Sequence, residues 1–187
     1  MMTSSYRPAP GRFLISEPFM EDENFQRTVV LLVEHGPNGS LGFVLNRMMK
    51  SVVADIVSDL SPVQSPLFLG GPVEQDSLHY VHRLGDQIPE SREIYPGLYW
   101  GGDFDTVKAS VISQSASESD ILFFVGYSGW APGQLSRELH RKAWIVAPEN
   151  TSFIFREDHE GLWKDLLRSM GSKYQVISNY PIDPRLN

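Results

Sequence analysis

The chain has 187 residues, 41% hydrophobic and 11% aromatic, which is enough for one substantial core but short for two domains. Its 23 acidic residues outnumber its 16 basic ones, and the net charge of -7 opposes broad attraction to nucleic acid or to an anionic membrane surface. The absence of cysteine excludes disulfides, thiolate nucleophiles and cysteine-ligated metals. The sequence also has no signal-peptide core and no apolar run of membrane length, so we expect a soluble cytoplasmic protein.

The first segments predict an arm followed by paired strands. Residues 1–10 are polar and contain prolines, so we expect a flexible N-terminal arm and then a single domain over residues 11–187. Strands are expected at Phe13–Ile15 and Thr28–Val33, where aliphatic residues follow one another. The dipeptide Asn38-Gly39 tolerates positive φ and predicts a hairpin into the next apolar run.

The middle of the chain predicts one helix, two strands and an exposed loop. Ser51 is suited to cap a helix whose buried face carries Val52, Val53, Ile56, Val57 and Leu60. Strands are expected at Leu67–Leu69 and Ser77–Leu84. The stretch Gly85–Pro96 contains prolines and several charges, which favours an exposed loop.

Further along, two strands and two helices are expected. Leu98–Trp100 resumes the sheet, and Asp103 begins a helix in which Phe104, Val107 and Val111 have the spacing of a buried face. Ala143–Ala147 has the composition of a strand. The stretch Gly161–Met170 predicts a helix, because its large apolar residues fall on one side.

The segment from residue 121 to residue 139 has the pattern of strand, tight loop and helix. Ile121–Val125 is wholly apolar, as in a central strand buried on both faces. Glycines at 126, 129 and 133 together with Pro132 predict that this strand ends near Val125. Leu135 and Leu139 then share one helical face. Strands outnumber helices by roughly eight to four over the whole chain, which favours a mixed α+β domain over a regular doubly wound sheet.

Four ordered motifs resemble the YqgE/AlgH family. They are the stretches 126–139, 25–35, 42–47 and 69–73, and the resemblance runs from about Gly11 to the last residue. The resemblance implies a bacterial α+β protein with a bent, partly barrel-closed mixed β-sheet flanked by about four helices. It implies no biochemical activity, although a regulatory role is proposed for some members.

Ser128 is the candidate nucleophile, because strand, Gly-x-Ser and helix are similar to the nucleophile elbow of α/β-hydrolases. The match is incomplete. Trp130 stands where the elbow needs glycine, and Pro132 and Gly133 separate the serine from the helix. A loop serine that satisfies a turn is therefore the favoured interpretation, and a hydrolase or acyl-transfer enzyme using Ser128 is kept as an alternative.

Metal and phosphate sites find little support in the sequence. His79 and His82 are three residues apart, so on a strand their imidazoles point to opposite faces. The glycine pairs at 70–71 and 101–102 match neither phosphate-binding fingerprint, and a structural role at strand ends explains them. No metal or cofactor is expected.

Basic residues suggest two further surfaces. Arg137, His140, Arg141 and Lys142 gather at a predicted helix C-terminus, where the helix dipole stabilises cations, and they are also the basis of an alternative hypothesis of direct DNA binding. Arg27 and Arg47 bracket the hairpin near Glu34, and an ion pair with Glu34 is the expectation.

The sequence as a whole favours a non-catalytic regulatory or binding protein that acts through a protein or small-molecule partner. Membrane association and direct nucleic-acid binding are not expected. Trp130 and Gln134 are predicted to anchor the loop after the central strand, since Gln134 offers donors and an acceptor to loop peptide groups. The candidate ligand or partner site comprises Asn46, Arg47, Gly70, Gly71, Ser128, Trp130 and Gln134.

Overall fold

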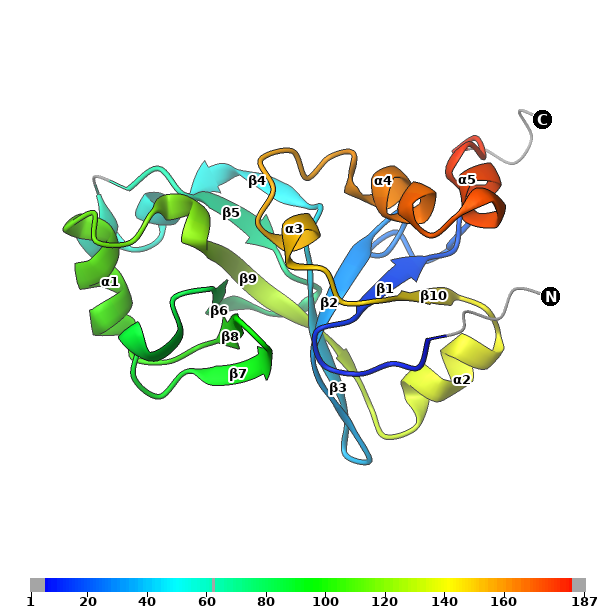
Figure 1. Cartoon of the computed structure of the whole chain (residues 1–187), viewed down its shortest axis with the longest axis horizontal. Helices are drawn as coiled ribbons and strands as arrows, with labels where there is room; N and C mark the ends of the chain where they lie inside the picture. Colours follow the sequence, from blue (N-terminus) through cyan, green and yellow to red (C-terminus); the bar gives the residue numbers. More distant parts are fainter. Residues whose placement is uncertain (1–5, 62, 183–187) are drawn as a thin grey trace.

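The computed structural model describes residues 6–61 and 63–182, and Figure 1 shows a strand-rich molecule with two lobes. The strands are β1 (Phe13–Ser16), β2 (Val29–Gly36), β3 (Gly39–Val44), β4 (Met48–Val52), β5 (Pro66–Leu69), β6 (Val73–His82), β7 (Arg92–Tyr95), β8 (Leu98–Trp100), β9 (Ile121–Trp130) and β10 (Trp144–Ala147). The α-helices are α1 (Phe104–Ile112), α2 (Gln134–His140), α3 (Thr151–Ile154), α4 (Leu162–Ser169) and α5 (Ser172–Ser178). Most of the predicted arm, residues 1–5, lies outside the described residues.

The strands form one mixed, mainly antiparallel sheet in the order β10-β1-β2-β3-β9-β6-β8-β7, with β5 paired to β9 in parallel and β4 paired to β5. This confirms the predicted α+β class. Barrel closure is not found among the described strands, because the path ends at β10 and β7, which lie in different lobes (Figure 1). The sheet is bent where β3 and β9 join the lobes (Figure 1).

The strand β9 is longer than predicted, because Gly126 bends it instead of ending it. It pairs with β5 up to Val125 and with β6 up to Tyr127, and from Ser128 to Trp130 it pairs with β3. At the bend Gly126 has φ 66, and a Cβ there would lie 2.7 Å from the carbonyl oxygen of Gly71. Glycine therefore allows one strand to belong to both lobes.

The helix predicted from Ser51 is wrong. This stretch forms β4 and two 3-10 turns, 53–55 and 58–60. Its apolar residues are mostly β-branched, which lose rotamer freedom in a helix, and the backbone of Val52 pairs with Pro66 in β5. The amide of Val52 donates to the carboxylate of Asp55, and Ile56 is 48% exposed instead of buried.

The predicted loop 85–96 is also wrong in part, since it contains β7. The turn at Gly97, which has φ 81, folds β7 back onto β8. The helices α3 and α5 were not predicted, because each has at most seven residues and neither has a long apolar period. The hairpin between β2 and β3, the Asp103 cap of α1 and the apolar face of α4 are confirmed.

Three hydrophobic clusters hold the fold together. The largest joins β1–β3 to the apolar face of α4, the second lies under α1, and the third packs α2 against β2, β3 and β10. Figure 1 shows α4 and α5 on one side of β10 and α2 on the other. None of the described helices has the length and apolarity that crossing a membrane requires.

Candidate ligand-binding site

The structure divides the residues of the predicted site into three places. Gly70, Gly71 and Ser128 lie where two chain segments cross. Trp130 ends β9 and Gln134 begins α2, while Asn46 and Arg47 lie in the link between β3 and β4. The last pair lines a hollow of about 470 Å³, larger than the hollow of about 350 Å³ that Trp130 lines.

The crossing point is a close backbone contact. A Cβ at Gly70 would lie 2.4 Å from the carbonyl oxygen of Gly126, and one at Gly71 would lie 2.2 Å from that of Tyr127. Ser128 is fully buried, and its hydroxyl donates to the Gly70 carbonyl at 3.0 Å. The glycine pair and the serine therefore have the structural roles that the sequence favoured.

The loop after β9 is anchored as predicted. The backbone N–H of Ala131 donates to Oε1 of Gln134 at 3.0 Å, and Trp130 is only 5% exposed. Sequence reasoning missed Glu138, whose carboxylate accepts from Trp130 Nε1 and Trp144 Nε1 at 2.8 Å each and from Gln134 Nε2 at 2.9 Å. The four-residue spacing of Gln134 and Glu138 on a helix is a signal for their contact, but no local pattern indicates Trp144.

Asn46 holds the turn that carries Arg27. Its Nδ2 donates to the Arg27 carbonyl at 2.8 Å, and its Oδ1 accepts from the Val29 amide at 2.9 Å. Arg27 has φ 50, a left-handed conformation that costs a residue with a side chain about 1–2 kcal/mol. The asparagine thus stabilises the strained backbone at Arg27, and both Arg27 and Arg47 line the same hollow.

These two arginines line a hollow of about 470 Å³, which we call the arginine hollow. It lies between the β3–β4 link and the first turn of α4, and it is lined by Arg27, Asn46, Arg47, Met48, Glu160, Gly161, Trp163 and Lys164. Three of these side chains are cationic and one is anionic. Within the described residues, none of the three cations forms an ion pair. The expected pairing with Glu34 is wrong, because Glu34 pairs with Arg92 on β7.

Neutral groups hold both guanidinium groups in place. Arg27 Nη2 donates at 2.6 Å to the carbonyls of Tyr180 and Pro181, and its Cζ lies 4.7 Å from the centre of the Trp163 ring. Arg47 donates to the Gln26 carbonyl. Burial lowers the pKa of Arg27 and of Arg47, and Arg27 Nε is buried with no hydrogen-bond acceptor among the described residues. The hollow therefore combines fixed, partly desolvated positive charge with a neutral framework, which suits an anion.

A family model described as AlgH-like matches residues 13–175. The chain belongs to the AlgH-like family. A UPF0301 protein of Cytophaga hutchinsonii is 44% identical over 178 residues, covering 95% of this chain and 98% of the relative. A UPF0301 protein of Chlorobium luteolum is 41% identical over 181 residues, covering 97% and 96%.

Solved structures agree with this AlgH-like assignment. The solution structure of AlgH from Pseudomonas aeruginosa has a TM-score of 0.73 and 28% identity, covering 96% of this chain and 98% of that one. The crystal structure of DIP2367 from Corynebacterium diphtheriae has a TM-score of 0.79 and 26% identity, covering 96% and 95%. These names identify a family and a fold without an activity.

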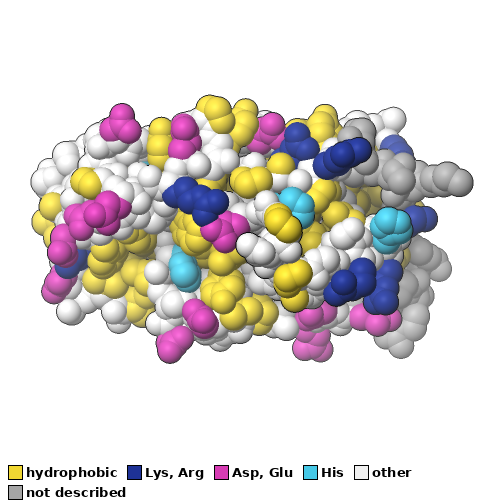
Figure 2. Space-filling model, turned by 90° about the horizontal axis from the view of Figure 1, so that it is seen from below, with side chains coloured by type: hydrophobic (Ala, Val, Ile, Leu, Met, Phe, Trp, Pro, Cys, Tyr) yellow, Lys and Arg dark blue, Asp and Glu magenta, His cyan; other side chains and the backbone are white. Residues whose placement is uncertain are grey.

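The remaining basic and histidine residues of this AlgH-like chain lie elsewhere. On the face shown in Figure 2, basic side chains gather mainly toward the end that carries α2, whereas acidic ones are spread along the length of the face. His79 contacts Ser77 Oγ at 2.9 Å, whereas His82 is buried and contacts the Gly101 carbonyl at 3.0 Å, so the two imidazoles have no common partner. In the part of the chain that the structure describes, no three potential ligands form a metal-binding group.

Proposed function

We propose that this chain is a non-catalytic binding protein that acts through a partner, and that its arginine hollow binds the anionic group of a small ligand. The observation that carries the proposal is the cluster of Arg27, Arg47 and Lys164 with no ion pair among the described residues, in a chain of net charge -7. Guanidinium groups match the planar, two-oxygen geometry of carboxylate and phosphate.

The geometry around Ser128 favours binding over catalysis. A nucleophilic serine needs a base within hydrogen-bond reach and access for a substrate. The Ser128 hydroxyl is instead buried and bonded to a backbone carbonyl. A regulatory role and a cytoplasmic location follow from the family resemblance and the composition, and they stay predictions.

Direct DNA binding receives less support than small-anion binding. A DNA-binding surface needs a contiguous basic area that neutralises several phosphates. The arginine hollow is concave and holds about 470 Å³, a volume within the range of small-ligand sites. The net charge of -7 opposes the approach of a long polyanion to the chain as a whole.

Calorimetric titration with inorganic phosphate and with pyrophosphate tests the proposal. Arg47→Gln and Lys164→Gln should each weaken binding by about tenfold, because each removes one of the unpaired cations. Arg92→Gln is the matched control, since it removes the same charge from an exposed arginine that is already paired with Glu34. The proposal is wrong if no saturable binding occurs, if all three variants bind equally, or if duplex DNA of random sequence binds more tightly than pyrophosphate at physiological salt.

A further inference from the structure

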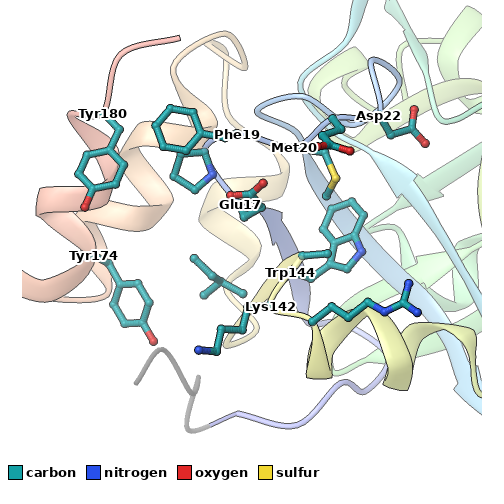
Figure 3. A pocket seen from close by; sticks show the side chains of 13 residues that line it. Glu17, Phe19, Met20, Asp22, Lys142, Trp144, Tyr174 and Tyr180 are labelled. Carbon is teal, nitrogen blue, oxygen red and sulfur yellow. The ribbon is translucent and has the colours of Figure 1, made fainter. Parts of the chain in front are cut away.

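A second, larger hollow lies between the segment after β1, the start of β10 and α5, and Figure 3 shows its lining from close by. We call it the aromatic groove, after Phe19, Trp144, Tyr174 and Tyr180 in its walls. Its volume is about 830 Å³, within the range of sites that enclose small organic molecules. The proposed function makes no use of this groove.

Glu17 is one of three acidic residues that line the groove, with Glu21 and Asp22, and Arg141 and Lys142 are its basic ones. The backbone N–H of Glu17 donates to the Ala143 carbonyl at 2.9 Å, which fixes the residue beside the start of β10. Its side chain is half-buried, and among the described residues its carboxylate has neither a hydrogen bond nor an ion pair. Figure 3 shows the carboxylate among the side chains of Phe19, Met20, Trp144 and Tyr174. A half-buried carboxylate with no cationic partner among the described residues offers its negative charge to a ligand, so the site favours a positively charged group.

Aromatic rings surround this carboxylate. Phe19 stacks on Tyr180 with ring centres 5.9 Å apart and an angle of 19° between the planes, which closes one end of the groove. Tyr174, on α5, also lines the groove (Figure 3). The negative faces of aromatic rings attract ammonium groups, and an acidic group among several rings is the usual arrangement for binding organic ammonium compounds.

The opposite wall carries a cation that Glu17 does not neutralise. Lys142 lines the groove, but it lies beyond 4.0 Å from any carboxylate of the described residues. It has φ 63 and closes α2, with its amide donating to the Leu139 carbonyl and the next amide donating to that of Glu138. Glycine is the usual residue at this position of a helix end, so a lysine here accepts backbone strain while placing its charge at the groove.

We propose that the aromatic groove binds a small organic compound with an ammonium group at one end, an apolar body, and an anionic group at the other end. The ammonium group lies against Glu17 and the rings of Phe19 and Tyr174. The apolar body covers Ile145, and the anionic group lies toward Lys142. This site has a different ligand chemistry from that of the arginine hollow, and the two share no charged residue.

The test uses three probes of equal chain length, hexylammonium, 6-aminohexanoate and hexanoate, titrated by nuclear magnetic resonance with the indole N–H of Trp144 as reporter. Hexylammonium and 6-aminohexanoate should bind saturably, and Glu17→Gln should weaken both by about tenfold or more. Lys142→Gln should weaken 6-aminohexanoate alone, because hexylammonium has no anionic end. Hexanoate should bind weakly or not at all.

Controls separate this site from general effects of charge and folding. Glu157→Gln removes an exposed carboxylate outside the groove and should leave all three titrations unchanged. Tyr174→Leu keeps apolar bulk without an aromatic face and should weaken hexylammonium several-fold. Phosphate binding should be unaltered by Glu17→Gln, so failure at one site is distinguishable from failure at the other. The inference is refuted if hexylammonium does not bind saturably, or if Glu17→Gln and Glu157→Gln bind it alike.

Discussion

The carboxylate of Glu138 is expected to be a major source of stability in the α2 lobe. It accepts hydrogen bonds from two indole N–H groups, those of Trp130 and Trp144, which belong to side chains only 5% and 4% exposed. A buried donor left without an acceptor costs about 1–3 kcal/mol. Because Glu138→Leu leaves both indoles unpaired, it should lower the free energy of unfolding by about 3–5 kcal/mol.

Glu138→Gln is a sharper variant, because its amide oxygen can still accept from both indoles. Its NH₂ group then faces Gln134 Nε2, which is also a donor, and Gln134 cannot turn over because its Oε1 already accepts from Ala131. We expect a loss of about 1–2 kcal/mol. Adding Gln134→Glu restores an acceptor at both contacts and should recover most of that loss.

Urea denaturation of the three variants, with the exposed Ser136→Ala as control, measures these values. The reasoning is refuted if Glu138→Leu unfolds within about 0.5 kcal/mol of the wild type, since the indoles would then have access to water. It is also refuted if the double variant is less stable than Glu138→Gln alone.

Three other results are expected. In urea denaturation, Trp130→Ala should lower the free energy of unfolding by about 3–5 kcal/mol. Ser128→Ala should lower it by under about 1 kcal/mol, because the Gly70 carbonyl still accepts a hydrogen bond from a backbone amide. Equal losses of stability in the two variants would contradict this. Lys142→Gly should raise the melting temperature. Relief of the left-handed backbone strain at this position is worth about 1–2 kcal/mol, which exceeds the entropic cost of glycine, about 0.5–1 kcal/mol. An unchanged or lower melting temperature would count against this reasoning. Burial lowers the pKa of His159 below its ordinary value of 6.5, so the unfolded chain binds the proton more readily than the folded one. The contribution of the neutral imidazole to stability should therefore be fully present above pH 6.5 and be lost as the pH drops below it. Urea midpoints from pH 8 to about pH 5 should therefore fall less steeply for His159→Gln, and parallel curves for variant and wild type would exclude the histidine as the cause.

Local patterns were sufficient for the elements whose signals lie within one segment. Asn38-Gly39 indicated the hairpin, and Asp103 indicated the start of α1, because turn and cap preferences act over a few residues. The helix predicted for residues 51–60 was wrong because its conformation depends on a distant segment. The apolar spacing of residues 51–60 fits a helix, but pairing with β5 decides their conformation, and that partner is not visible in the local pattern.

The candidate site was predicted only in part. The motif that contains Asn46 and Arg47 indicated one wall of the arginine hollow, but Lys164 and Trp163 come from α4, and no periodicity connects the two segments. The sequence correctly indicated an unusual backbone conformation at Gly126, but this residue bends β9 and does not end it. Spaced glycines in a local pattern predict a strand end. Here β9 continues past Gly126, because β3 pairs with it beyond the residues that pair with β6.

The central claim is that an anion binds between Arg27, Arg47 and Lys164, and side-chain magnetic resonance tests it most directly. The Nε–H signals of the arginines, assigned through single substitutions, are followed while inorganic phosphate is added. The account predicts that the signals of Arg27 and Arg47 shift together and saturate at one dissociation constant, while that of Arg92, already paired with Glu34, does not move. Uniform, non-saturating shifts of all arginine signals, or a saturating shift confined to arginines outside the hollow, would contradict it.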